Sequence, residues 1–302
     1  MAAIFLPLPL LALLVLWGFD LNISIDILTR QYQGQQLLIK GDGSGAFHAW
    51  QPLAKAGVPK VQEAIGDLYR HGVGVKKDPQ RAAQWYRKAA LRGRKEAQSS
   101  YAEMLLRGEG LSKDVEAAHF WFRRAADLGY AKAQKNLAQL YYEGREVPQD
   151  YPKAMKWYRL LAENRDTQGQ NGYGMNMVAL MRFSGHGGRV EPGGSLSDFE
   201  QAVRFGSVQA MHNLATILHQ GAGGVLVDHK RALQLARMAA RKGHPGSAFL
   251  AGVMLINGRG GAANPQEGVS LLRYSASRGD ARAVAALKQL TAVPALPSTS
   301  AP

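Results

Sequence analysis

The chain has 302 residues, contains no cysteine and carries 37 Lys and Arg against 23 Asp and Glu, which gives a formal net charge of +14 at pH 7. The absence of cysteine excludes a disulfide framework and a zinc site built on thiolates. The positive charge favours acidic partners, such as an acidic protein, an acidic polysaccharide, anionic lipid or nucleic acid. We rank nucleic acid last, because the sequence has no basic and aromatic motif of the kind that stacks RNA bases.

The chain opens on an apolar stretch. Residues 1–19 contain no charged side chain, and Leu, Val, Phe and Trp dominate them. About 20 apolar residues cross a bilayer as a helix, so we expect an N-terminal hydrophobic helix that is a signal peptide or a membrane anchor. The stretch ends at Trp17, Gly18 and Phe19 without the small-residue pattern of a cleavage site, which favours an uncleaved anchor. If the segment is cleaved, the protein is secreted.

Residues 20–57 are expected to be a linker that ends in half a repeat. Asp42 lies fifteen residues before Gly57, which matches the length of one helix with its capping residue. Apolar residues between them follow the helical period: Ala46, Trp50 and Leu53. Pro52 falls inside this stretch, where its ring and its missing N–H would interrupt a helix.

Glycines recur about every 36 residues over residues 57–291. One series consists of Gly57, Gly93, Gly129, Gly206, Gly243 and Gly279. A second series consists of Gly72, Gly108, Gly144, Gly185, Gly221 and Gly258. Two series out of phase predict two helices per repeat, so residues 58–291 are expected to hold six repeats and a closing helix. Because each helix pair then buries its apolar face against its neighbours, function is expected on a surface.

Each repeat carries a face expected to be buried and a capping residue. In the first helix, small or apolar residues occupy positions 4, 8, 9 and 12 after the first glycine, as in Val61, Ile65, Gly66 and Tyr69. This spacing places them on one helical face that we expect to be core. The second helix opens on an acceptor side chain that can bind free backbone N–H groups. These capping residues are Asp78, Asp114, Asp150, Glu191, Asp228 and Asn264.

The first repeat shows the fullest motif. Its residues are Gly66, Tyr69, Gly72, Asp78, Ala82, Trp85, Tyr86, Ala89, Ala90 and Gly93. The same signature returns within residues 137–162 and 214–243. It resembles the Sel1-like repeat, a relative of the tetratricopeptide repeat. The resemblance implies an all-α, right-handed α-solenoid of antiparallel helix pairs that binds proteins or peptides as an adaptor in signalling or envelope processes, with no catalysis and no cofactor.

One branch of the same family raises an enzymatic alternative. The cysteine-rich branch is linked to β-lactam binding or hydrolysis and has a disulfide in each repeat. This chain departs from that branch because it has no cysteine.

Two signals disagree on the side of the membrane that holds the repeats. Arg30 and Lys40 follow the apolar stretch closely and favour a cytoplasmic body. The family resemblance favours the periplasm, and we expect a membrane-anchored protein that faces the periplasm. Residues 292–302 are rich in Pro, Ser and Ala, so they are expected to be a disordered tail.

The fourth copy departs from the period. Gly144 and Gly185 are 41 residues apart, five more than the spacing of the preceding copies. Glycines and amides replace the helical period over residues 162–176, which predicts a loop. Side chains of this loop are candidates for binding a partner: Asn164, Arg165, Tyr173 and Met175.

A second set of candidates lies on the first helices, at positions 6, 10, 13 and 14 of each repeat. These positions share a side that, by analogy with tetratricopeptide repeats, lines a concave groove. The side is mostly charged in the first two repeats, as at Glu63, Asp67, Arg70 and Glu103. Later residues on it are apolar, aromatic or histidine, as expected for a partner site: Tyr142, Leu180, Phe183, His212, His219, Phe249, Val253 and Ile256. The alternative is that the last three pack against the closing helix.

Arginine recurs in the second helices, at Arg87, Arg123, Arg159, Arg237 and Arg273. The series is either an anion-binding ladder or a set of consensus arginines that pair with nearby acids or face solvent. We favour the second interpretation.

No catalytic or metal-binding motif stands out. His212 and His219 are seven residues apart on one helical face, but they lack the further ligands of a zinc site. The chain contains no Gly-x-Ser-x-Gly, His-Glu-x-x-His or Ser-x-x-Lys sequence. We therefore predict a membrane-tethered scaffold, without metal or cofactor, for a protein or peptide that the positive charge favours to be acidic. The alternatives are a β-lactamase-like hydrolase and a binder of an anionic polymer.

Overall fold

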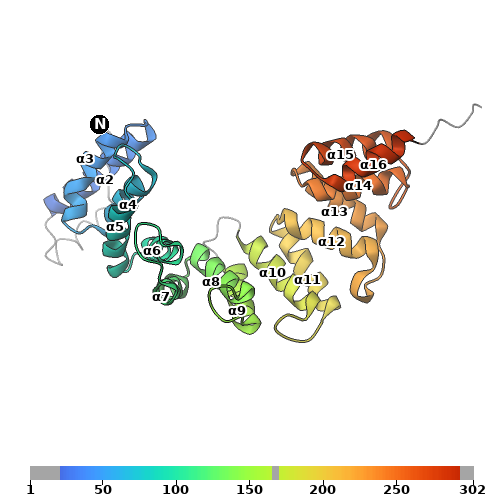
Figure 1. Ribbon diagram of the computed structural model, residues 1–302, viewed down its shortest axis with the longest axis horizontal. Coiled ribbons are helices and arrows are strands. Elements are labelled where there is room, and N and C mark those ends of the chain that lie inside the picture. Colours follow the sequence, from blue (N-terminus) through green and yellow to red (C-terminus); the bar gives the residue numbers. More distant parts are fainter. Residues whose placement is uncertain (1–20, 165–169, 293–302) are drawn as a thin grey trace, which may run out of the picture. The chain divides into compact units, whose positions relative to one another are not determined.

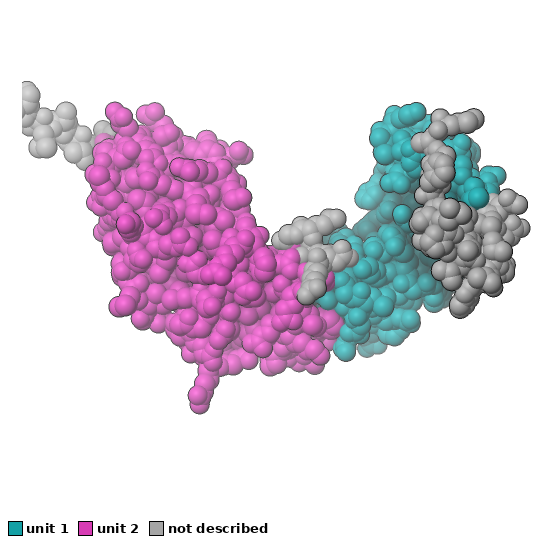
Figure 2. Space-filling view, turned by 180° about the vertical axis from the view of Figure 1, so that it is seen from behind, with its two compact units in different colours: residues 1–137 teal, residues 138–302 magenta. Residues whose placement is uncertain are grey.

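The computed structural model describes residues 21–164 and 170–292. Within these residues it contains fifteen α-helices, one short 3-10 helix and no strand (Figure 1). The chain divides into two compact units, residues 1–137 and residues 138–302 (Figure 2). The all-helical solenoid expected from the glycine period is confirmed.

Unit 1 is a stack of helices in which consecutive helices from α2 to α7 pack against each other. The helices are α2 (Leu21–Ile39), α3 (Gly43–Lys55), α4 (Pro59–His71), α5 (Pro79–Leu91), α6 (Lys95–Arg107), α7 (Val115–Asp127) and the first half of α8 (Ala131–Glu143). The expected core face is buried: Val61, Ile65, Gly66 and Tyr69 of α4 are all largely shielded from solvent.

Unit 2 continues the same pattern from the second half of α8. Its helices are α9 (Tyr151–Glu163), α10 (Asn171–Ser184), α11 (Pro192–Arg204), α12 (Val208–Gln220), the 3-10 helix η1 (Ala222–Gly224), α13 (His229–Arg241), α14 (Pro245–Ile256), α15 (Pro265–Ser277) and α16 (Ala281–Ala292). Helices α10 to α14 surround one buried cluster that includes Phe199, Leu214 and Leu235. The closing helix exists, and it runs to Ala292, where the tail was expected to begin.

The helix ends follow the sequence signals closely. Asp78 and Asp114 accept hydrogen bonds from the backbone N–H three residues ahead at 2.9 Å, and Asp150, Asp228 and Asn264 do the same at 2.9–3.1 Å. Glu191 is the exception, because its carboxylate binds the Arg182 guanidinium at 2.5 Å and makes no cap. The first helices end at glycines with positive φ, such as Gly72 at 72° and Gly108 at 67°, where a side chain would be strained.

Within residues 20–57, the possible half-repeat is present as helix α3, whereas most of the expected linker before it is helix α2. Asp42 caps α3 by accepting from the Gly45 N–H at 2.8 Å, and α3 continues through Pro52 to Lys55. The predicted stripe of Ala46, Trp50 and Leu53 is buried. Helix α2 packs on this stripe at Gly34, since a Cβ at Gly34 would come within 2.1 Å of the Trp50 indole nitrogen.

The expected loop over residues 162–176 is also wrong in extent. Helix α9 continues to Glu163 and α10 begins at Asn171, so Tyr173 and Met175 belong to a helix. Gly174 is buried against α9, where a Cβ would lie 2.8 Å from the Tyr158 carbonyl oxygen. Gly174 therefore permits close packing of α9 and α10 and does not form part of a loop.

Several expectations fall outside the described residues. The hydrophobic helix of residues 1–19, Arg165 and residues 293–302 lie there. Among residues 21–164 and 170–292, no helix combines the length and apolar character that crossing a bilayer requires.

Candidate protein-interaction surface

Charged side chains link the first helices of unit 1 on the predicted groove side. Arg94 binds Glu63 at 2.6 Å and Glu96 at 3.1 Å. Glu103 is buried, and its carboxylate forms an ion pair with the Lys132 ammonium group at 2.7 Å. The Arg70 guanidinium lies 3.6 Å from the same carboxylate. These pairs join α4, α6 and α8 through side chains rather than through a hydrophobic core, so this side of unit 1 is polar and preorganised.

Burial changes the ionisation of groups on this side. Desolvation raises the pKa of Glu63, and the hydrogen bond and charge of Arg94 only partly oppose that effect. A hydrogen bond from Arg70 at 2.8 Å lowers the pKa of Glu109. The Tyr86 hydroxyl donates to Asp67 at 2.5 Å, and burial together with the Asp67 charge raises the pKa of Tyr86.

A hollow of about 250 Å³ opens between α2 and α4. We call it the α2–α4 groove. Its apolar wall consists of Leu38, Trp50, Val61 and Ala64. Its polar lining consists of Gln31, Gln35, Lys60, Glu63, Asp67 and Arg94. The Trp50 indole N–H is held by the Gln31 carbonyl at 3.2 Å, so the wall is fixed in place.

The groove could not be predicted without α2. The sequence indicated only two parts of the groove. Its α4 wall contains charged positions of the first repeat, and Trp50 belongs to the apolar stripe of the half-repeat. A signal for α2 was present, because Ile27, Gln31, Gly34 and Leu38 recur at helical spacing and Gly34 provides room for a large ring.

The apolar candidates of unit 2 are half-buried rather than freely exposed. Leu180, Phe183 and Met175 pack against the buried cluster of that unit. Ile256 lies against Gly268 of α15, and Val253 is half-buried on the same helix. The Arg282 guanidinium of α16 lies 4.7 Å from the Phe249 ring centre, which agrees with the alternative that this end of α14 contacts the closing helix.

Tyr142 lies in an aromatic cluster instead of on an open face. Its ring contacts Tyr151, Tyr158 and His186 edge to face at centroid distances of 5.6, 6.5 and 6.0 Å. Tyr173 joins the cluster through Tyr158 at 6.1 Å. Asn164 ends α9, and its carbonyl accepts the Asn171 side chain at 2.6 Å.

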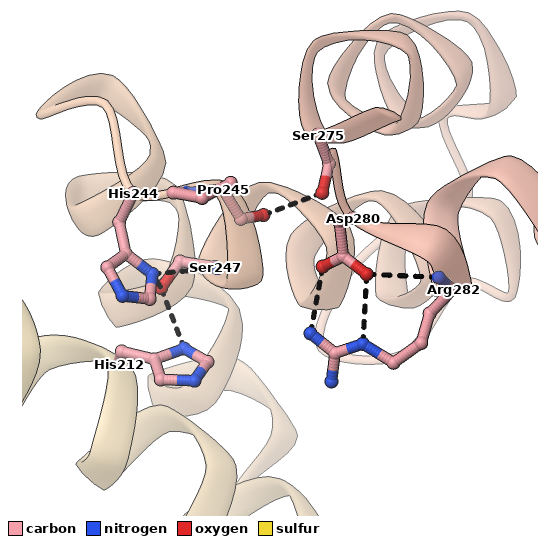
Figure 3. Close-up of polar contacts among 7 residues, drawn as sticks. All are labelled: His212, His244, Pro245, Ser247, Ser275, Asp280 and Arg282. Atoms are coloured by element: carbon pink, nitrogen blue, oxygen red, sulfur yellow. Dashed lines mark hydrogen bonds and ion pairs between the residues drawn. The ribbon is translucent and has the colours of Figure 1, made fainter. Parts of the chain in front are cut away.

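His212 belongs to a hydrogen-bonded joint between α12 and α14 (Figure 3). Its Nδ1 lies 2.9 Å from the Ser247 hydroxyl, which in turn lies 3.1 Å from Nδ1 of His244. The two rings are 4.4 Å apart. Burial lowers the pKa of His212 to about 4, and the nearby His244 and Arg282 act in the same direction. Ser247 is fully buried, so the joint presents no accessible nucleophile.

A second histidine pair lies at the other end of α12. His219 and His229 have ring centres 5.1 Å apart. Burial lowers the pKa of His219, and the charges of His229 and Arg259 add to that effect. No group of three or more His, Asp or Glu side chains in the described part of the chain is arranged to hold a metal ion.

The sequence model of the Sel1 repeat matches residues 59–93, 95–130, 131–166, 208–244 and 245–280, which is more than half of the chain. The chain belongs to the Sel1 repeat family. Sel1 repeat proteins typically act as protein-interaction scaffolds and are generally not catalytic. The unmatched residues 167–207 include the divergent fourth copy, which still folds as the helix pair α10 and α11.

Two solved structures resemble this Sel1 repeat protein over most of its length. A Sel1 repeat protein from Oxalobacter formigenes is 27% identical with a TM-score of 0.70, and the match covers 82% of this chain and 99% of that one. The protein c5321, a protective antigen present in uropathogenic Escherichia coli strains, displays an SLR fold. It is 27% identical with a TM-score of 0.74, and the match covers 87% of this chain and 56% of that one. Curated proteins provide no match.

Proposed function

We propose that this protein is a non-catalytic scaffold that holds a protein or peptide segment in the α2–α4 groove, while residues 1–19 tether it to a membrane on the periplasmic side. The observation that carries the proposal is the groove itself. Its volume of about 250 Å³ and its combination of an apolar wall with converging polar groups are typical of a site for part of a peptide.

The chemistry of the groove suits a peptide segment with an apolar anchor. The side-chain amides of Gln31 and Gln35 can donate to and accept from a peptide backbone. Lys60 is exposed and makes no ion pair with the described residues, so its ammonium group is available to a partner carboxylate. An apolar side chain against Leu38 and Trp50 would return roughly 1.5–3 kcal/mol on full burial.

A substitution that fills the groove tests the proposal. We expect Ala64→Arg to abolish affinity capture of the partner by the full-length chain, because Ala64 lines the groove and is only half-buried. Gln84→Arg on the exposed side of α5 adds the same side chain elsewhere and serves as the control. Partners that remain bound to the Ala64→Arg protein, at an unchanged melting temperature, would show that the groove is not the binding site.

The proposed tether is tested separately. We expect the full-length chain to stay in the membrane fraction after alkaline carbonate washing, with its N-terminus intact. Protease added to the periplasmic side should digest the repeats. A soluble mature species that starts between about residues 20 and 30, the usual signal-peptide length, would show secretion instead.

The non-catalytic part of the proposal has its own test. Purified full-length protein should leave a chromogenic β-lactam unchanged. Turnover that disappears on a single substitution in the repeats would show a hydrolase.

A further inference from the structure

A second candidate site, in addition to the α2–α4 groove, lies in unit 2, where residues 185–191 contact the start of α9. Gly187 has a φ of 86°, and a Cβ there would lie 3.3 Å from the Tyr151 carbonyl oxygen. His186 stacks flat on the Tyr151 ring, with centroids 4.4 Å apart and an interplanar angle of 1°. These contacts hold the segment against α9 and place its side chains beside those of the helix.

A hollow of about 340 Å³ lies along this contact, and a smaller one of about 90 Å³ adjoins it. Both are lined by Met155, Arg159 and Gly187. Pro152, Lys156 and Leu160 complete the lining of the larger hollow. The smaller hollow is also lined by Arg182, His186, Gly188, Arg189 and Glu191. We use the name basic hollow for the space between six of these residues: Met155, Lys156, Arg159, Leu160, Gly187 and Arg189.

The cations of the basic hollow make no ion pair among residues 21–164 and 170–292, although the Glu191 carboxylate also lines the smaller hollow. Lys156, Arg159 and Arg189 are exposed, and none of them makes an ion pair with any residue in the described part of the chain. The neighbouring Arg182 differs, because Glu191 at 2.5 Å and Asp198 at 2.7 Å neutralise it. The charges of Arg159 and Arg189 also help to lower the pKa of Glu191, which places both near that carboxylate.

Two other arginines of the second helices differ from Arg159, because each forms an ion pair. Arg123 pairs with Asp127 at 3.0 Å, and Arg237 pairs with Glu267. The arginine series is therefore not a uniform ladder of anion sites. Arg159 has a guanidinium without an ion pair among the described residues and lies beside a hollow, because the 185–191 segment supplies the opposite wall.

The apolar part of the basic hollow narrows the choice of ligand. Met155 is almost fully buried at its floor, and Leu160 is 37% exposed at its edge. A bare inorganic anion would leave this apolar surface unused, whereas a peptide with an acidic residue next to an aliphatic one would use both parts. We propose that the basic hollow binds an acidic segment of a protein partner, with a carboxylate on Arg159 and Arg189 and an aliphatic side chain against Met155 and Leu160. The site is separate from the α2–α4 groove and does not depend on it.

Fluorescence anisotropy with a labelled nonapeptide of alternating Asp and Leu tests this site in the full-length chain, held in a neutral detergent. We expect the double variant Arg159→Gln and Arg189→Gln to weaken binding at least tenfold, since charge-assisted hydrogen bonds are lost. The variant Arg87→Gln and Arg273→Gln is the matched control, because both arginines are exposed, occupy the repeat position of Arg159 and make no ion pair with the part of the chain that the structure describes. It should bind the peptide as the unmodified chain does, and both variants should keep the original melting temperature.

A charge reversal distinguishes a site from a general charge effect. The variant Arg159→Glu and Arg189→Glu should no longer bind the peptide of alternating Asp and Leu, and it should bind a peptide of alternating Lys and Leu. Equal loss of binding in the Arg87 and Arg273 control would show attraction by net charge alone and overturn the proposal. Binding of an oligo-dT strand or of inorganic phosphate as tight as that of the peptide, with the same dependence on Arg159 and Arg189, would show an anion site that does not select peptides, and would also overturn it.

Discussion

Gln98 donates a side-chain N–H to the backbone carbonyl of Ala90 across 3.2 Å, and the amide side chain is completely buried. Gln62 makes the same bond to Ala54 at 3.0 Å, and Gln134 makes it to Ala126 at 3.2 Å. Each bond links the first helix of one repeat to a carbonyl group in the last turn of the preceding helix. The same carbonyl also accepts the backbone N–H of the following glycine, which is Gly57, Gly93 or Gly129. The three bonds recur with the period of the repeat and connect neighbouring repeats of unit 1.

We expect Gln98→Ala to lower the free energy of unfolding by about 1–3 kcal/mol, because it leaves a cavity and removes a buried hydrogen bond. Gln84→Ala on the exposed side of α5 should change it by less than about 0.5 kcal/mol. Urea denaturation followed by circular dichroism measures both. Equal midpoints for the two variants would show that the repeated glutamine bond does not stabilise unit 1.

Gly34→Leu should detach α2 from α3. The new side chain would occupy the position of the Trp50 ring, because even a Cβ at Gly34 comes within 2.1 Å of it. Limited proteolysis should then cleave within residues 21–39, and the Trp50 fluorescence should shift to longer wavelength. Gln33→Leu, at an exposed neighbour on α2, is the control. An unchanged digestion pattern for Gly34→Leu would contradict the observed packing of α2.

His212 predicts a pH dependence of stability in unit 2. Its folded pKa of about 4 lies below its ordinary value of 6.5, so the folded state binds the proton less well than the unfolded state. The folded state is therefore at full stability above about pH 6.5 and loses stability as the pH falls towards 4, by about 1–2 kcal/mol after allowance for solvent screening. The lowered pKa values of His219 and His244 act in the same direction.

His212→Asn should weaken this dependence, since asparagine can keep the contact with Ser247 but does not titrate. Stability measured by urea denaturation at pH 7 and pH 4.5 should fall less in the variant than in the unmodified chain. The same loss in both proteins would show that the His212 joint does not carry the acid sensitivity.

Phe183→Asp should destabilise unit 2. Phe183 packs against the buried cluster of that unit and against Gly223, so a carboxylate there loses apolar contacts and is poorly solvated. We expect a loss of about 2–4 kcal/mol in the free energy of unfolding. Val190→Asp, at a residue that is 61% exposed, is the control and should have little effect. Phe183→Asp with normal stability and no partner capture would restore Phe183 to the partner surface.

The repeat period predicted the helix pairs, the caps and the buried positions, because these depend on local spacing within one repeat. Gly66, Asp78 and Gly72 each have the role expected of them. The fourth copy was harder to predict, because a glycine such as Gly174 is common both in loops and where two helices pack closely. Its role in packing follows from its contacts with Tyr158 and Ala162, which lie on a different helix.

The candidate sites depend still more on contacts that are distant in sequence. The α2–α4 groove brings Gln35 together with Asp67, and the basic hollow brings Arg159 together with Arg189. Both require segments that the repeat pattern does not describe. Phe183 and Tyr142 were recognised as unusual for their position, but their contacts lie within unit 2.

Site-specific photo-crosslinking tests the central claim, that the α2–α4 groove holds a protein or peptide segment, most directly. A photoreactive residue at Gln35 of α2 or at the exposed Lys60 of α4, which both line the groove, should crosslink the full-length chain in cells to the same partner, at adjacent residues of that partner. The same residue at Gln84, on the exposed side of α5, should give no such product. Crosslinks from Gln84 as strong as those from Gln35 and Lys60, or none from either groove position while the partner is still captured, would contradict the account.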